Sequence, residues 1–224
     1  MTEVSSGLRA VVFDLDGLMF NTEDLYQQVG TEVLRRRGKE FTSELIDQMM
    51  GRQAHKALQL MVDYHNLDDT WEELAAESMQ IMFTLLPDQL EPMPGLLDLL
   101  ASLESANIPK AIATSSTRAF VDRVLKQFDL TSRFSFVLTA EDIANGKPAP
   151  DVYLLAAEMH GVAPEQTLVL EDSQIGCQAA VAAGTFAVAV PSGQSEQHRF
   201  PGVQLIADSL ADPRIYDALA IQGV

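Results

Sequence analysis

Two aspartates one residue apart end the first apolar segment of the chain. The segment Val11–Phe13 is followed by Asp14, Leu15, Asp16 and Gly17. Because residues i and i+2 of an extended chain point to the same side, their two carboxyl groups are held close together. Two like charges at this spacing are unfavourable unless a cation lies beside them. The pair indicates either a metal or catalytic site or, since Asp and Gly favour turns, an ordinary turn after a strand.

Other polar residues follow later apolar segments in the same way. They are Thr114, Ser115 and Ser116 after residues 110–114, Lys147 in the loop after residues 134–139, and Glu171 and Asp172 after residues 167–170. In open α/β sheets, ligands bind beyond the carboxyl ends of the strands. We therefore expect these residues to converge with Asp14 and Asp16 at one edge of a sheet.

The chemistry of these residue types is coherent. Three carboxylates with backbone oxygens suit a hard, octahedral cation such as Mg²⁺. Hydroxyls and amides at the start of the helix after Thr114 would bind an anion, and a lysine adds a compact positive charge. Each feature also has a structural alternative: helix capping for Thr114 and for Glu171 with Asp172, and a solvated loop position for Lys147.

The pattern of apolar residues predicts the strands and helices that must position these residues. Val11–Phe13 is typical of a strand buried on both faces. A leucine-rich helix is predicted from Pro94 to near Asn107. Beyond it, strands are predicted at 110–114, 134–139, 167–170 and 186–190, and helices at 118–128, 150–160 and 174–183. Strands separated by single helices predict an α/β fold with a doubly wound parallel sheet.

Residues 22–86 carry amphipathic helical patterns and no convincing strand. We therefore predict an α/β core domain of residues 1–19 and 92–224, interrupted by an α-helical cap domain of residues 20–91. Because this insert leaves the core at the edge where ligands bind, it would lie over the site as a lid.

The composition of the chain argues against some classes of binding partner and predicts its cellular location. Fifteen Lys and Arg against 32 Asp and Glu give a net charge of −17, which opposes binding to nucleic acid or to an anionic membrane. No apolar run approaches the roughly 20 residues of a membrane helix, and the first residues lack a signal-peptide core, so a cytoplasmic protein is expected. The single cysteine, Cys177, is expected to be a packed, inert thiol. Arg35–Arg37, near the end of a predicted helix, are expected to cap it.

Four motifs in order resemble those of the haloacid dehalogenase-like superfamily. Within it, the chain is similar to the phosphatases and β-phosphoglucomutase-like proteins that carry a helical cap after the first strand. The resemblance covers essentially the whole chain. The motifs are Asp14-Leu15-Asp16-Gly17, Thr114-Ser115-Ser116, Lys147-Pro148-Ala149-Pro150-Asp151 and Glu171-Asp172-Ser173-Gln174-Ile175-Gly176.

The resemblance implies a role for each of these residues. Asp14 would be the nucleophile that forms an aspartyl-phosphate, and Asp16 the general acid and base. Mg²⁺ would be bound by the Asp14 carboxylate, the Asp16 backbone carbonyl and Asp172, with Glu171 orienting the metal shell. The phosphoryl oxygens would be held by Thr114, Ser115, Ser116 and Lys147.

The cap is less informative about the substrate. Arg52, after Gly51, lies where the family often sends a residue toward the site, and it is a candidate substrate-binding residue. Related mutases carry a cap histidine and a cap lysine, but this chain has Tyr26 at the place of the histidine and no lysine between Lys56 and Lys110. We expect a phosphatase, monomeric or weakly dimeric, that acts on a small phosphorylated metabolite, with a phosphosugar mutase as the alternative.

Overall fold

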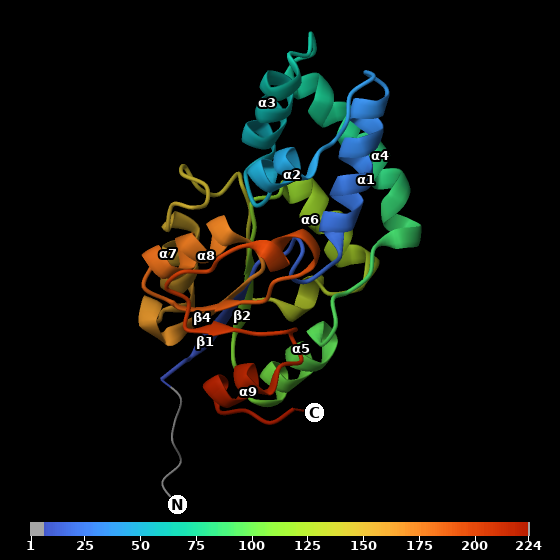
Figure 1. The fold of residues 1–224 in the computed structure, drawn as a ribbon. Helices are drawn as coiled ribbons and strands as arrows, with labels where there is room; N and C mark the ends of the chain where they lie inside the picture. Colours follow the sequence, from blue (N-terminus) through green and yellow to red (C-terminus); the bar gives the residue numbers. More distant parts are fainter. Residues whose placement is uncertain (1–6, 224) are drawn as a thin grey trace, which may run out of the picture.

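The computed structural model describes residues 7–223 and has an α/β core beneath a group of helices (Figure 1). The six strands of the sheet are all parallel, in the order β3-β2-β1-β4-β5-β6. The strands are β1 (Ala10–Phe13), β2 (Lys110–Ala113), β3 (Val137–Leu138), β4 (Thr167–Glu171), β5 (Phe186–Ala189) and β6 (Leu205–Ile206). The predicted fold class is confirmed.

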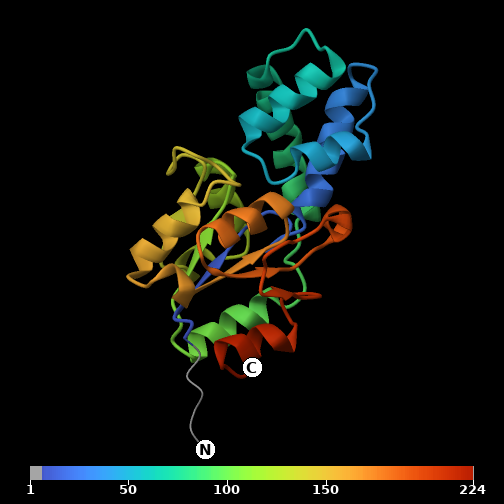
Figure 2. The same ribbon diagram turned by 60° about the vertical axis from the view of Figure 1, so that its left-hand side comes forward.

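Helices cover both faces of the sheet (Figure 2). Alternate side chains of β1 point to opposite layers: Val11 and Phe13 belong to one apolar cluster and Val12 to another. The first layer contains α5 (Leu96–Ser105), α6 (Arg118–Gln127) and α9 (Pro213–Leu219), and the second contains α7 (Asp151–His160) and α8 (Gln174–Ala182). Because β1 is central and wholly buried, it needs apolar residues at every position.

The segment between β1 and α5 forms four helices and no strand. They are α1 (Thr22–Arg35), α2 (Ser43–Met49), α3 (Ala54–His65) and α4 (Trp71–Gln89). The two connections to the core run together, since the amide of Asn21 donates to Glu91 O over 3.1 Å and the amide of Glu91 donates to Asn21 Oδ1 over 2.7 Å. The division into domains at residues 20 and 91 remains a prediction, and we refer to the four helices as the cap.

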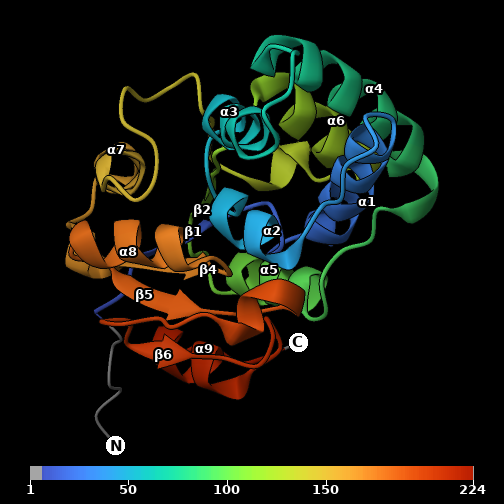
Figure 3. The same ribbon diagram turned by 45° about the horizontal axis from the view of Figure 1, so that its top comes forward.

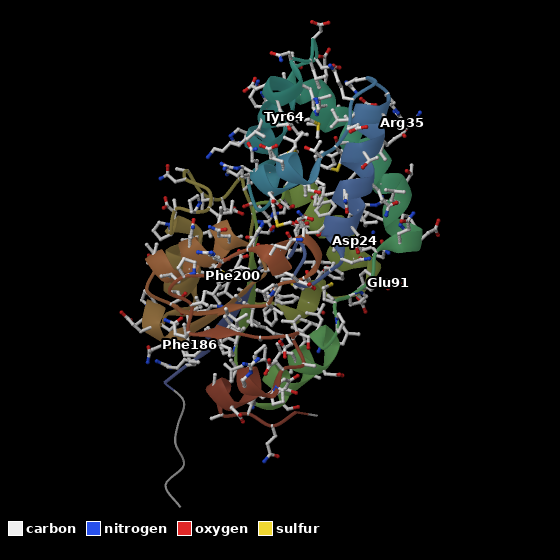
Figure 4. The ribbon with its side chains drawn as sticks, viewed as in Figure 1. Asp24, Arg35, Tyr64, Glu91, Phe186 and Phe200 are labelled. Atoms are coloured by element: carbon white, nitrogen blue, oxygen red, sulfur yellow. The ribbon has the colours of Figure 1, made fainter. Side chains whose placement is uncertain are left out.

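The cap has a near end and a far end relative to the core. In Figure 4, Asp24 and Glu91 mark the near end, and Arg35 and Tyr64 mark the far end. At the far end, Arg37 donates to Val33 O in the last turn of α1 over 2.8 Å and forms an ion pair with Asp69 at 2.7 Å. The expected helix capping is confirmed for Arg37, whereas the side chains of Arg35 and Arg36 form ion pairs with Glu32.

Several elements differ from the sequence prediction. The strand expected over 134–139 is only β3, because residues 131–133 form a 3₁₀ turn (η1, Thr131–Arg133) and Phe134 packs edge-on against Phe13. Strand β6 and helix α9 were not predicted, and neither were two further 3₁₀ segments, η2 (Pro164–Gln166) and η3 (Gly193–Gln197). Within residues 7–223, no helix is long and apolar enough to cross a membrane.

Candidate active site

The polar residues that follow the strands do converge at one edge of the sheet. Strand β1 lies between β2 and β4, so Asp14 at its end is flanked by Thr114 and by Glu171. The backbone amide of Asp14 donates to Leu170 O over 3.0 Å, which fixes it against β4. Carboxylate oxygens of Asp14, Glu171 and Asp172 all lie within 4.8 Å of one another.

Lys147 is the buried cation of this cluster. Its ammonium donates to Asp14 Oδ1, to Glu171 Oε1 at 2.6 Å and to Ala113 O at 3.1 Å. Burial alone lowers the pKa of Lys147, but the charges of Asp14 and Glu171 outweigh it and raise the pKa above its usual value. Lys147 is only 6% exposed, so the alternative of a solvated loop lysine is wrong.

Every acceptor position of Glu171 is occupied. Oε1 accepts from Lys147 and from the hydroxyl of Tyr153 at 2.7 Å, and Oε2 accepts from the amide of Ser173 at 3.1 Å and from its hydroxyl at 3.0 Å. A carboxylate has about four lone-pair sites. Glu171 therefore serves as an anchor for its neighbours and has no free site for a further ligand.

Asp172 and Asp16, by contrast, each keep a free oxygen. Oδ2 of Asp172 and Oδ1 of Asp16 are buried and have no hydrogen-bond partner. Gly17 leaves the space beside Asp172 open: its φ is +75°, and a Cβ there would lie 2.2 Å from Asp172 Oδ2. The partnerless Oδ2 of Asp172, beside the carboxylate of Asp14, supplies the hard oxygen ligands that a divalent cation prefers. The residues present therefore fit a metal ion.

The hydroxyl groups after β2 surround Asp16. Ser116 Oγ donates to Asp16 Oδ2 over 2.6 Å and Thr114 Oγ1 donates to the same oxygen over 3.2 Å. Neither caps the next helix, because α6 begins after Thr117, which makes no side-chain cap. Helix α8 is capped by Ser173, whose hydroxyl accepts from Gly176 N at 3.1 Å. The capping alternatives for Thr114 and for Glu171 with Asp172 are therefore wrong.

Burial and mutual repulsion shift the acidic groups in one direction. Burial is the largest cause that raises the pKa values of Asp14, Asp16 and Asp172. Glu171 adds to the rise for Asp14 and Asp172, and Lys147 opposes it. Burial and the charge of Asp16 also raise the pKa of Glu23, at the start of α1, to about 8. Without a bound cation, these raised pKa values favour the protonated, neutral form of the carboxyl groups.

Three residues near the cluster were missed by sequence reasoning: Glu23, Gln53 and Tyr153. Tyr153 occupies an apolar face of α7, where an aromatic residue signals core packing, and only the fold shows its hydroxyl at Glu171. Gln53 lies against Gly146, next to Lys147, because a Cβ on that glycine would be 2.6 Å from Gln53 Cδ. Glu23 adjoins the first motif in sequence, which was the available signal.

Arg52, the candidate substrate ligand, and Arg118, at the start of α6, make other contacts. Arg52 is exposed, donates through Nε to Gln48 O over 2.6 Å and lines an outer hollow of about 490 Å³ with His55 and Trp71. Among the described residues, no contact joins Arg52 to the carboxylates. Arg118 is bound to Asp142 at 2.9 Å and to Val137 O at 2.8 Å.

Cys177 is packed as expected. Its side chain is buried beneath the cluster, and burial, followed by the charges of Glu171 and Asp172, raises the pKa of its thiol. A thiol with a raised pKa is a poor nucleophile at neutral pH. Cys177 is therefore a packing residue.

Comparisons with known proteins agree with this geometry. A probable pseudouridine-5'-phosphatase from Drosophila melanogaster is 35% identical over 207 residues, covering 90% of this chain and 89% of that protein. A fructose-1-phosphate phosphatase from Escherichia coli is 33% identical over 180 residues, covering 80% of this chain and 95% of that protein. The crystal structure of β-phosphoglucomutase from Clostridium difficile superimposes with a TM-score of 0.80 over 95% of this chain and 97% of that one, and at 21% identity it shows the fold alone.

A family model also matches most of the chain. The model for haloacid dehalogenase-like hydrolases matches residues 11–190, from the strand before Asp14 to the end of the strand that follows α8. All four groups of motif residues lie within this span. The chain belongs to the haloacid dehalogenase-like hydrolase family.

Proposed function

We propose that the chain is a Mg²⁺-dependent phosphatase that hydrolyses a small phosphorylated metabolite through an aspartyl-phosphate on Asp14. The single observation that carries the proposal is the asymmetry of the two aspartates. Asp14 is held by Lys147 at the carboxyl end of the central strand, whereas Asp16 has a buried Oδ1 without any partner. One carboxyl is thereby suited to attack and the other to carry a proton.

The chemistry proceeds in two displacements. The Asp14 carboxylate attacks phosphorus and the ester P–O bond breaks, while Asp16 gives its proton to the departing oxygen. Asp16 then takes a proton from water, the water oxygen attacks phosphorus, and the Asp14–phosphorus bond breaks. Burial raises the pKa of Asp16, which favours the protonated form that the first step needs.

The other residues hold the phosphoryl group and the metal. Lys147, Thr114 and the amides of Ser115 and Ser116 would bind the phosphoryl oxygens. Asp14, Asp172 and the backbone carbonyl of Asp16 would hold the cation, with Glu171 fixing the ligands from behind. When bound, Mg²⁺ would offset the negative charge of the phosphoryl group and of the carboxylates around it.

The sequence relatives support hydrolysis as the reaction. The two described above are named as phosphatases of pseudouridine-5'-phosphate and of fructose-1-phosphate. The mutase alternative lacks support from the cap, where Tyr26 replaces the histidine of related mutases. The hydroxyl of Tyr26 lies 3.4 Å from Ser116 Oγ, so this position faces the hydroxyl groups around Asp16.

Phosphate release from p-nitrophenyl phosphate tests the proposal directly. We expect turnover that requires Mg²⁺ and is lost in Asp14→Asn, whereas Asp217→Asn on the exposed face of α9 keeps wild-type turnover. Acid quenching during turnover should trap phosphate on the wild-type protein and none on Asp14→Asn. Conversion of β-glucose 1-phosphate to glucose 6-phosphate, without phosphate release, would establish the mutase instead.

A further inference from the structure

The loop between α2 and α3 closes over the candidate active site. Gly51 O accepts from Ser115 Oγ over 3.2 Å, and a Cβ on Gly51 would lie 2.8 Å from Ile175 Cγ1 and 2.9 Å from Ser173 Oγ. Gln53 packs against Gly146. The loop thus contacts the segments after β2, after β3 and after β4, and Figure 3 shows α2 over the ends of β1 and β2.

Within this loop, Gln53 is the side chain turned toward the core. It is 9% exposed although it belongs to the cap, and it lies beside the residue that precedes Lys147. It is the N-cap residue of α3, but its side chain makes no capping hydrogen bond. An amide offers two donors and an acceptor without any charge. Gln53 therefore places neutral hydrogen-bonding groups beside the loop that carries Lys147.

The positive side chains, by contrast, are engaged or lie elsewhere. Lys147 is already bound by two carboxylates and a carbonyl. Arg52 and Lys56 line the outer hollow of α3, and Arg118 is paired with Asp142. The cluster at Arg35–Arg37 lies at the far end of the cap (Figure 4). Among residues 7–223, Lys147 is the only Lys or Arg whose side chain contacts the carboxylates of the site.

From this distribution we propose that Gln53 is a specificity-determining residue, and that the leaving group is uncharged and bears hydroxyl groups. The inference rests on the proposed phosphatase function and names its substrate class. A hydroxyl of the leaving group would exchange hydrogen bonds with the Gln53 amide. A second phosphate or carboxylate would be buried beside Asp16 and Glu23 without a counter-charge, which is strongly unfavourable.

Matched substrates test the substrate class on the unmodified protein. We compare kcat/KM for fructose 1-phosphate with fructose 1,6-bisphosphate, and for glycerol 3-phosphate with phosphoglycolate, all with Mg²⁺. In each pair, kcat/KM should be at least about 100-fold higher for the substrate with the neutral leaving group. This ratio corresponds to about 2.7 kcal/mol of transition-state binding. Equal kcat/KM within either pair would overturn the substrate class. If the Arg52→Ala variant lost activity toward the bisphosphate alone, the specificity would lie in Arg52. That result would overturn the role of Gln53.

Variants of Gln53 test the residue itself. Gln53→Ala should raise KM for fructose 1-phosphate about tenfold with little change in kcat. Gln53→Lys should raise the ratio of bisphosphate to monophosphate kcat/KM about tenfold. Gln59→Ala, on the exposed face of the same helix, is the matched control and should behave as wild type.

The outcomes separate this inference from the proposed function. Unchanged selectivity in both Gln53 variants, with p-nitrophenyl phosphate still hydrolysed, would overturn the role of Gln53 and leave the phosphatase standing. Absence of Mg²⁺-dependent hydrolysis of every ester, by a protein that melts cooperatively, would overturn both.

Discussion

The hydroxyl of Tyr153 donates to Oε1 of Glu171 over 2.7 Å, the same oxygen that Lys147 contacts. The ring of Tyr153 also lies 5.1 Å from the Lys147 ammonium. Tyr153 therefore supports both members of the ion pair behind Asp14, through its hydroxyl and through its aromatic face. It is fully buried, so water cannot replace the hydroxyl.

Tyr153→Phe keeps the ring and removes only this hydroxyl. We expect the free energy of unfolding to fall by about 1–3 kcal/mol, the usual loss for a buried hydrogen bond to a charged group, and kcat to fall several-fold. Urea denaturation and steady-state kinetics measure the two effects. Tyr216→Phe on α9, where the structure shows no hydrogen bond from the hydroxyl, is the control. Equal losses in both variants would assign the effect of Tyr153→Phe to general packing.

Glu171 and Asp172 should respond in opposite ways to loss of charge. Asp172→Asn removes a charge whose Oδ2 has no partner, so the metal-free protein should be at least as stable as wild type. Glu171→Gln places an amide among four donors and should cost about 3 kcal/mol. Urea denaturation with a chelator present compares them. A stabilised Glu171→Gln would contradict the anchoring role of Glu171.

Removal and addition of Mg²⁺ give a second contrast between these two variants. Mg²⁺ should raise the melting temperature of the wild type, because a ligand that binds only the folded state stabilises it. Asp172→Asn should lose most of this increase, whereas Glu171→Gln should keep part of it. An unchanged increase in Asp172→Asn would exclude Asp172 as a ligand.

The metal-free protein should lose stability as the pH rises. Burial, followed by the charge of Asp16, raises the pKa of Glu23 from 4.5 in a free side chain to about 8. Between these values the folded chain binds more protons than the unfolded chain, so the free energy of unfolding falls from about pH 4.5 to about pH 8. Urea denaturation across this range, with a chelator, measures the slope. Glu23→Gln should reduce it, and an equal slope in both proteins would contradict the prediction.

Gly176→Ala should destabilise although Gly176 lies within a helix. In an exposed helix this change stabilises by about 1 kcal/mol. Here a Cβ would lie 1.8 Å from Glu171 Oε1, so the carboxylate that anchors Lys147 must move. Thermal unfolding and kcat should both decrease. Gly30→Ala in α1, where a Cβ would meet the half-buried ring of Phe41, should affect stability without lowering kcat.

The convergence of the polar residues could be predicted from sequence because the carboxyl ends of parallel strands share an edge. That rule placed Asp14, Thr114, Lys147 and Glu171 together without knowledge of any side-chain contact. The strand predicted before Lys147 was too long, because a run of apolar residues predicts burial but not hydrogen bonding to a neighbouring strand. Phe134 is buried against Phe13 but lies outside the ladder.

Other features depended on contacts between distant parts of the chain. The direction of the loop at residues 51–53 is set by its packing on the core, so the family resemblance favoured Arg52 where the structure turns Gln53 inward. Helix α9 was overlooked although Asp212 before Pro213 is a typical helix start, with Asp212 accepting from the amide of Arg214 over 2.9 Å. Its short apolar pattern gave too weak a signal.

The position of β1 has a consequence for how the chain folds during synthesis. β1 is made before the two strands that flank it, and these are distant in sequence: Val11 pairs with Lys110, and Ala10 pairs with Thr167. Contacts of such long sequence separation form slowly because a large loop must close first. The four apolar residues of β1 therefore remain unpaired while α1–α4 are synthesised and can fold. Asp14 therefore takes its place between the ends of β2 and β4 only after both strands have left the ribosome.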